Sequence, residues 1–187
     1  SLAQEELVER VRLGDVEGVG SAVLRGADVN FADFLHDGGK RPLHVAVLGG
    51  WRSVVASLVS FGADPNLGDA GGRTALWLAT RRGDLDMVRF LLEEVGKPWL
   101  DPHSHPDNLV RGGGTDLRVF VSIDQPCHTT LYTPLHLAAR ANHLPLTALL
   151  LHHGASPTRR NAAGETPLHL AAARGFHSVC ATLIKGG

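Results

Sequence analysis

A repeated octet constrains the fold of this chain more than any other feature. TPLHLAAR at residues 133–140 returns as TPLHLAAA at residues 166–173, and RPLHVAVL at 41–48 and TALWLATR at 74–81 are related to it. The steps between these four segments are 33, 59 and 33 residues, so the middle step is one period plus 26 residues. A second marker, GADVN at 26–30, GADPN at 62–66 and GASPT at 154–158, agrees with this spacing. A fixed period in this range is typical of a solenoid of stacked units.

The residues of one unit predict a pair of short helices. Threonine is a good N-cap and proline suits the first helical position, so Thr133 and Pro134 mark a helix start. A glycine-containing turn and a second apolar helix follow, and Gly26, Gly62 and Gly154 stand where a left-handed residue ends a helix. Such a unit cannot bury its apolar face alone, and stacking is what makes it stable.

The octet, the GAD marker and the period resemble the ankyrin repeat. The resemblance implies an all-α ankyrin-repeat solenoid of about five helix-turn-helix repeats, with hairpin loops and one long loop insertion. We expect a single domain, 1–187, with repeats at about 1–30, 31–66, 67–99, 130–158 and 159–187 and an insertion at about 100–129. It also implies that His44, His136 and His169 are scaffold residues.

Composition excludes several classes of protein. The net charge of −1 gives the whole molecule no strong attraction to nucleic acid or to an anionic membrane. Two distant cysteines are no disulfide framework and favour the cytoplasm or the nucleus. No apolar run reaches the length of a membrane span, the start is no signal peptide, and no phosphate loop or nucleophile elbow is present. We therefore expect no enzyme, cofactor, nucleic acid, membrane or small-molecule substrate.

Three departures from the repeat pattern are candidates for function. The hairpin at 31–40 is longer than the others and contains Phe31, Phe34 and Leu35, which either pack on the first repeat or form an exposed knob. The octet of the third repeat has Trp77 in place of histidine, and packing is the default for it. Trp51 follows the octet of the second repeat, near the expected inner face, where a partly exposed tryptophan would be a contact residue.

The excess of residues at 98–129 predicts an extended loop. Its prolines and its triple glycine disfavour helix, and the alternation at 117–123 favours either one short strand or an enlarged hairpin. Asp101, His103, His105 and Asp107, with Cys127 and His128 nearby, leave a metal site open, although the spacing matches no structural zinc signature. Cys127 is expected to be exposed and Cys180 to lie in the core.

The resemblance also implies where a partner would bind, because partners of ankyrin arrays usually meet the hairpin tips and the exposed side of the first helices. Those positions are enriched in arginine, which forms forked bonds to carboxylate or phosphate. The positions are Lys40, Leu48, Ala70, Arg73, Arg81, Arg82, Tyr132, Arg140, Arg160, Glu165 and Arg174.

The sequence therefore predicts a protein–protein interaction module, acting as a scaffold or adaptor, that binds an extended acidic peptide or loop in a basic concave groove. Arginines would pair with the acidic groups, and Trp51, Trp77 or Tyr132 would be apolar anchors. Two alternatives stay open. One is the substrate-recognition subunit of a ubiquitin ligase, as in ankyrin proteins with a SOCS box, which would lie past Gly187. The other is a metal-binding or enzymatic role of the 98–129 loop.

Overall fold

The computed structural model describes residues 2–33, 38–95 and 121–186, and these form helices joined by turns and hairpins. The elements are α1 (Leu2–Leu13), α2 (Val16–Leu24), α3 (Pro42–Gly49), α4 (Arg52–Ser60), α5 (Ala75–Arg82), α6 (Leu85–Phe90), the π-helix η1 (Leu91–Val95), α7 (Pro134–Arg140), α8 (Leu144–His152), α9 (Pro167–Ala172) and α10 (His177–Lys185).

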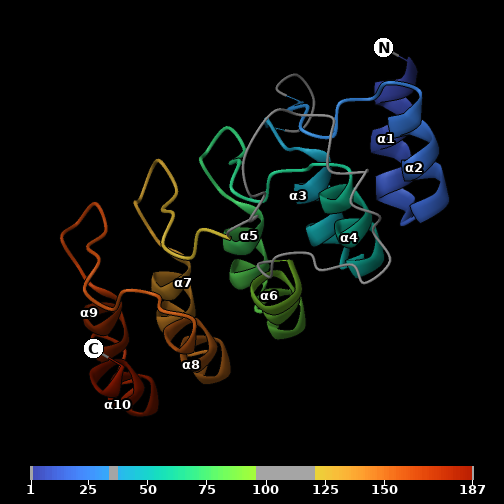
Figure 1. Ribbon diagram of the computed structural model, residues 1–187. Helices are drawn as coiled ribbons and strands as arrows, with labels where there is room; N and C mark the ends of the chain where they lie inside the picture. The colour runs from blue at the N-terminus through green and yellow to red at the C-terminus, as the bar shows by residue number, and fades with distance from the viewer. Residues whose placement is uncertain (1, 34–37, 96–120, 187) are drawn as a thin grey trace, which may run out of the picture.

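The helices stack as successive antiparallel pairs. Helices α1, α3, α5, α7 and α9 pack on one another in chain order and form the inner layer. In the outer layer α2 packs on α4, α6 on α8 and α8 on α10. The pairs descend from the N-terminus to the C-terminus as a slanting stack, with the hairpins projecting from the same side (Figure 1). The predicted all-α ankyrin solenoid is confirmed.

Local chemistry starts the inner helices α5, α7 and α9 and ends the outer helices α2, α4 and α8 as the sequence predicts. The Thr133 and Thr166 hydroxyls accept hydrogen bonds from the backbone N–H of His136 and His169, and proline occupies the first turn of both helices. Thr74 caps α5 in the same way, through the N–H of Trp77. The outer helices α2, α4 and α8 are each followed by a left-handed glycine, with φ of 93°, 92° and 88° at Gly26, Gly62 and Gly154.

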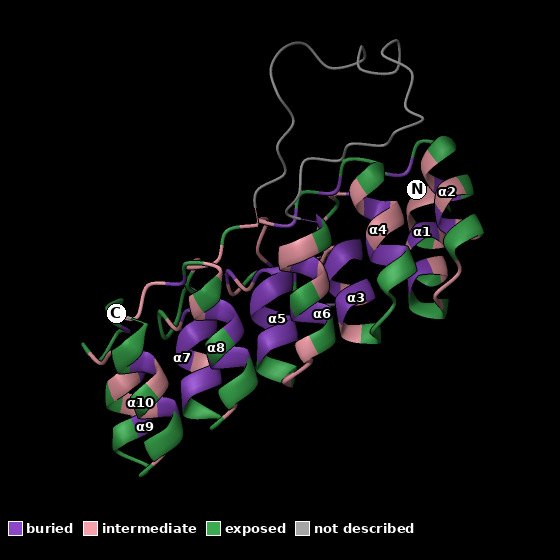
Figure 2. Cartoon of the chain, turned by 60° about the horizontal axis from the view of Figure 1, so that its bottom comes forward, coloured by how far each residue is buried: buried purple, intermediate pink, exposed green. Residues whose placement is uncertain are grey.

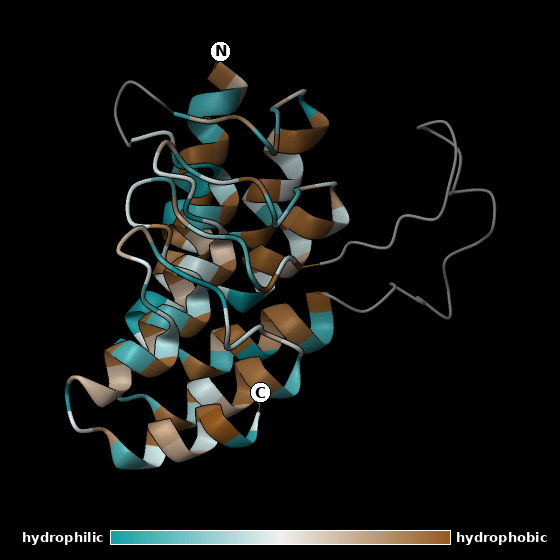
Figure 3. Cartoon of the chain, turned by 90° about the vertical axis from the view of Figure 1, so that its left-hand side faces the viewer, coloured by the Kyte–Doolittle hydropathy of each residue, from teal (hydrophilic) through white to brown (hydrophobic). Residues whose placement is uncertain are grey.

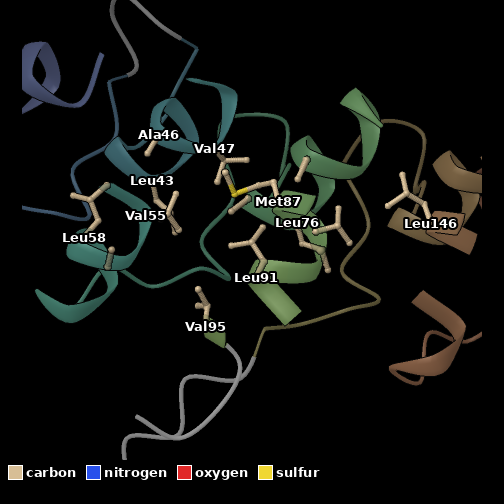
Figure 4. Close-up of a cluster of buried hydrophobic side chains, with 14 of the residues drawn as sticks. Leu43, Ala46, Val47, Val55, Leu58, Leu76, Met87, Leu91, Val95 and Leu146 are labelled. Atoms are coloured by element: carbon tan, nitrogen blue, oxygen red, sulfur yellow. The ribbon is translucent and has the colours of Figure 1, made fainter. Parts of the chain in front are cut away.

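One continuous apolar core runs through the stack. Buried residues gather where neighbouring pairs of helices face one another (Figure 2). Leu43 and Val47 of α3, Val55 and Leu58 of α4, and Leu76, Met87 and Leu91 of the third pair meet in one cluster (Figure 4). Hydrophobic segments recur along successive helices, whereas the hairpins carry hydrophilic stretches (Figure 3). Among the described residues, no helix combines the length and apolar character needed to cross a bilayer.

The octet histidines tie one repeat to the next. The His136 Nε2 lies 3.1 Å from the carbonyl oxygen of Glu165, and its Nδ1 accepts a hydrogen bond from the N–H of Thr133 at 3.3 Å. His44 has the same arrangement, with Leu67 O at 3.0 Å and Arg41 N at 3.1 Å. Both rings are buried. Burial lowers the pKa of His136 and lowers the pKa of His44 to about 4. His169 keeps its bond to Thr166 but is exposed.

The insertion begins at a lengthened outer helix and ends in renewed repeat contacts. Helix α6 continues as η1 to Val95, and residues 96–120 lie outside the described part. At 2.6 Å the Asn66 Oδ1 accepts the N–H of Ser122, as the Asn30 Oδ1 accepts that of Asp64. The Asp124 carboxylate in turn accepts the N–H of Ser156. Repeat contacts therefore resume at residue 122, before the predicted start of the fourth unit at residue 130.

The structure bears on two expectations about local segments, the strand at 117–123 and the long hairpin at 31–40. Residues 121–123, the described part of the predicted strand at 117–123, form no strand, because Ser122 bonds to the Asn66 side chain instead of a strand partner. In the long hairpin an antiparallel bridge joins Asp33 to Lys40, and Phe31 is 42% exposed. Phe34 and Leu35 lie outside the described residues.

Candidate functional site

Two adjoining cavities lie along the inner helices and the bases of the hairpins. The larger, of about 630 Å³, is bounded by the hairpins before α5 and α7 and by the ends of α5, α7 and α9. The smaller, of about 300 Å³, extends toward α3 and shares Arg73 and Arg81 with the larger. We call the two together the basic cavity, because they are lined by the cationic residues Lys40, Arg73, Arg81, Arg82, Arg140 and Arg174.

The repeat period brings the cations together. Arg81 and Arg82 end α5, and Arg140 ends α7. Arg174 follows the end of α9, one period after Ala141. Because stacked repeats place equivalent positions side by side, residues that are widely separated in sequence become neighbours. The Arg174 Nη1 donates to the backbone oxygen of Arg140 at 3.2 Å, which joins two of these positions directly.

Aromatic rings form the floor beneath the guanidinium groups. The Arg81 guanidinium lies 5.6 Å from the centre of the Trp77 ring, and that of Arg140 lies 5.6 Å from the centre of the Tyr132 ring. These distances are typical of cation–π contacts. The Tyr132 ring also stacks on His136. A planar guanidinium held over a ring keeps N–H groups available for an anion.

The floor is a hydrophobic cluster separate from the main core. Its buried members are Trp77, Leu78 and Cys127, and the half-buried Leu48, Tyr132 and Leu137 pack against them. Half-buried side chains at the bottom of a cavity leave apolar area for a ligand to cover. The basic cavity thus offers apolar contact below and charge around its rim.

The charge of the basic cavity is mostly uncompensated. Asp69 is buried and holds Arg73, with the carboxylate Oδ2 2.6 Å from Nη2. Burial raises the pKa of Asp69, but hydrogen bonds from the Arg73 side chain and backbone outweigh this and leave the pKa below its usual value. Among the described residues, Arg81, Arg82, Arg140 and Arg174 form no ion pair. No described aspartate or glutamate lines either cavity.

The predicted binding residues are only partly brought together. The structure places Lys40, Arg73, Trp77, Arg81, Arg82, Tyr132, Arg140 and Arg174 around the basic cavity. Trp51 and Arg160 line neither part of it. Trp51 lies in the turn between α3 and α4, over the backbone of Gly49 and of Gly14 in the preceding turn, and is 42% exposed. The Arg160 Nη1 instead donates to the oxygen of Gly164 within its own hairpin, at 2.7 Å.

The structure also shows how far the two cysteines are buried, and it bears on the metal hypothesis. Cys127 is buried, 3% exposed, which corrects the expectation of an exposed thiol. It is buried because the hairpin closes over it, with Sγ 3.1 Å from the Thr130 hydroxyl. Cys180 is half-buried against the core. No three potential metal ligands gather among the described residues, and Asp101, His103, His105 and Asp107 fall outside them.

Some lining residues were missed by the sequence analysis. Thr129, Thr130 and Leu137 line the larger part of the cavity and are in the fourth repeat. The hairpin before α7 holds the two threonines, and it is one residue longer than the hairpins before α5 and α9. Cys127 N donates to Tyr132 O across residues 128–131, whereas Asp69 N donates to Arg73 O across residues 70–72. An alignment of the hairpins, rather than of the octets alone, would have drawn attention to this segment.

Comparison with known proteins identifies the family. A model described as "Ankyrin repeats (3 copies)" matches residues 7–100, and one described as "Ankyrin repeats (many copies)" matches residues 135–184. The chain belongs to the ankyrin-repeat family. The two matches lie on either side of the insertion, in agreement with the helix pairs of the structure.

Three relatives are each less than one third identical in sequence to this chain. The "Nuclear factor NF-kappa-B p105 subunit" of Gallus gallus is 29% identical over 84% of this chain, and human "Rabankyrin-5" is 29% identical over 94%. This ankyrin-repeat chain spans only 17% and 15% of the lengths of those two proteins. The "Putative ankyrin repeat protein YahD" of Escherichia coli (strain K12) is 28% identical, over 93% of this chain and 92% of its own length.

Proposed function

We propose that this chain binds a segment of a partner protein in the basic cavity and acts as a scaffold or adaptor. Ankyrin-repeat proteins are generally interaction modules without enzymatic activity, and the relatives of this chain support a role in protein–protein interaction. The segment we propose is extended and acidic. The observation that carries the proposal is that six cationic side chains, and no described carboxylate, line two adjoining cavities.

Charge and rigidity both favour such a ligand. Arginines without carboxylate partners bind carboxylates through paired, charge-assisted hydrogen bonds, and the low net charge of the chain makes their clustering local. A stacked helical floor loses little conformational freedom when a ligand binds, so more of the contact energy remains as affinity. The half-buried Tyr132 and Leu137 add apolar area to the contact.

We also propose that the protein acts in the cytoplasm or the nucleus. Cys127 and Cys180 are both free thiols, one buried and one half-buried, in separate parts of the stack. Reduced thiols of this kind are typical of those compartments. Expression of the chain with a fluorescent tag in cells, with its compartment observed by fluorescence microscopy, tests this part of the proposal.

A peptide selection tests the proposed binding site. A displayed library of unstructured peptides of random sequence is selected on the purified wild-type chain, on Arg81→Gln/Arg140→Gln and on Arg52→Gln/Arg89→Gln. The last pair is a matched control, because both arginines are exposed on outer helices. Selected peptides are then sequenced and their affinities measured by fluorescence anisotropy.

We expect peptides selected on the wild type to be enriched in aspartate and glutamate. Their affinity should fall by roughly ten- to a hundredfold for the Arg81→Gln/Arg140→Gln variant, about 1–3 kcal/mol of charge-assisted bonding, and should change little for the control. Selected peptides without acidic enrichment, or an unchanged affinity of the cavity variant, would contradict the proposal.

A further inference from the structure

Leu131 has a backbone conformation that leucine rarely adopts. Its φ is 53°, in the left-handed region, where a side chain with bulk crowds the backbone. The other described non-glycine residue with positive φ is Asn142, whose short polar side chain tolerates this region. Leucine has no such compensation. An unusual conformation of this kind persists only where the surrounding structure or a function maintains it.

Other repeats place glycine at the equivalent position. Leu131 directly precedes Tyr132, which closes its hairpin with Cys127. Gly72 and Gly164 directly precede the closing residues of their hairpins, with φ of 72° and 78°. The repeat backbone therefore requires a left-handed residue at this point, and in this hairpin the position is filled by leucine rather than by the residue that fits it best.

Leu131 is also exposed beside the basic cavity. It is 41% exposed. Its neighbours in the chain, Thr130 and Tyr132, both line the cavity. The hairpin is fixed on both sides, because His128 N donates to Gly71 O at 2.8 Å and Ala162 N donates to Thr130 O at 3.0 Å. Leu131 does not itself line either cavity, but its exposed apolar side chain is thus held at a defined place in the chain between two residues that do.

We propose that Leu131 is an apolar contact for the partner segment, which carries an apolar side chain next to its acidic groups. This inference rests on the proposed function of the basic cavity. The cations supply attraction for the acidic groups, and burying leucine against an apolar side chain adds affinity that does not depend on charge. Leu131 also discriminates, since a purely acidic segment leaves it uncovered and gains nothing from it.

The experiment uses a set of fluorescein-labelled peptides of ten residues. Each is glutamate throughout except at one position, which is leucine in one series and serine in the other, and this position is moved along the peptide. Binding to the full chain is measured by fluorescence anisotropy, for the wild type and for Leu131→Gly and Leu131→Asn. Both replacements tolerate a left-handed backbone, and Leu131→Asn retains a side chain of moderate size. Thermal unfolding is followed by circular dichroism.

We expect at least one leucine peptide to bind the wild type roughly tenfold more tightly than its serine counterpart, as expected for one buried aliphatic side chain. Both variants should lose this advantage, bind the serine peptides as the wild type does, and unfold at a temperature no lower than the wild type. That combination separates a binding role of Leu131 from a structural one.

Several results would overturn the inference. One is the absence of any leucine advantage in the wild type, and another is an advantage that persists in either variant. A lower unfolding temperature in both variants, with weaker binding of the serine peptides, would make Leu131 a support of the hairpin instead. Failure of the wild type to bind any of the acidic peptides would overturn the proposed function itself, and is thereby distinguishable from a failure of the Leu131 contact.

Discussion

The junction between the third and fourth repeats differs from the junctions on either side of it. At those neighbouring junctions a buried histidine of the octet, His44 or His136, donates to a backbone oxygen of the next repeat. At the third junction Trp77 takes the place of the histidine, and its indole Nε1 donates to Tyr132 O at 2.9 Å. Tyr132 immediately precedes the capping Thr133, as Glu165 precedes Thr166, so the tryptophan reaches an equivalent acceptor.

The comparison shows that one side chain can both make the hydrogen bond between repeats and line the candidate binding site. The histidine rings are confined between repeats and contribute to the scaffold. The larger indole completes the same hydrogen bond and also reaches the basic cavity, where Arg81 lies over its ring. The insertion lies at this junction. The hairpin before α7 is also one residue longer than those before α5 and α9, and it has Leu131 where those two have glycine. The third junction therefore combines scaffold and candidate binding site.

The largest effect that would sharpen this comparison is expected from Trp77. Trp77→Ala removes a side chain that is 6% exposed, and with it one of the two donors to the Tyr132 oxygen, which keeps the N–H of Cys127. We expect the free energy of unfolding to fall by about 3–5 kcal/mol. Trp77→His should recover part of this loss, because an imidazole Nε2–H can restore the bond but does not fill the volume. Chemical denaturation of the three proteins measures the difference, and equal losses for alanine and histidine would show that the hydrogen bond to Tyr132 contributes little.

A smaller effect is expected where the first seven residues of two octets are identical but their surroundings differ. His136→Ala removes the bonds to Thr133 and to the oxygen of Glu165 in a fully buried setting, and should cost about 2–3 kcal/mol of unfolding free energy. His169→Ala removes only an exposed bond to Thr166 and should stay within about 0.5 kcal/mol. Urea unfolding of both variants tests the pair. Similar losses would mean that helix capping, not the tie between repeats, determines the role of the histidine.

A third effect is expected from pH, and it acts only on the histidine junctions. Burial lowers the pKa of His44 to about 4, so the folded state favours the neutral ring, while the unfolded chain binds a proton near pH 6.5. The stability due to neutral His44 is complete above about pH 6.5 and declines as the pH falls toward 4, by an amount on the order of 3 kcal/mol. The lowered pKa of His136 acts in the same direction.

Denaturation at a series of pH values, with NMR titration of the histidine side chains, measures this dependence. The indole of Trp77 does not titrate in this range, so the third junction should keep its hydrogen bond at pH 4. A His44 pKa near 6.5 in the folded protein would contradict the expected dependence.

Much of the fold could be predicted from local residues. Thr133 and Pro134 start a helix through their own capping chemistry, and Gly62 ends one through its freedom at positive φ, so neither depends on distant contacts. The arginines of the basic cavity were found because a period carries each position onto its neighbour. Trp51 was expected near the inner face but covers the turns at Gly14 and Gly49. Its position depends on which way a turn faces, and the period does not specify that.

The sequence by itself determined the repeating helix pairs, their caps and the residues that face the core, because these depend on interactions within a few residues and on a spacing that repeats. Only the tertiary structure decided that Trp77 bonds to Tyr132, 55 residues away in sequence, and that Leu131 is left-handed and exposed. Those outcomes depend on how the hairpin before α7 returns to the stack after the insertion. Long-range geometry of that kind is set by packing between repeats.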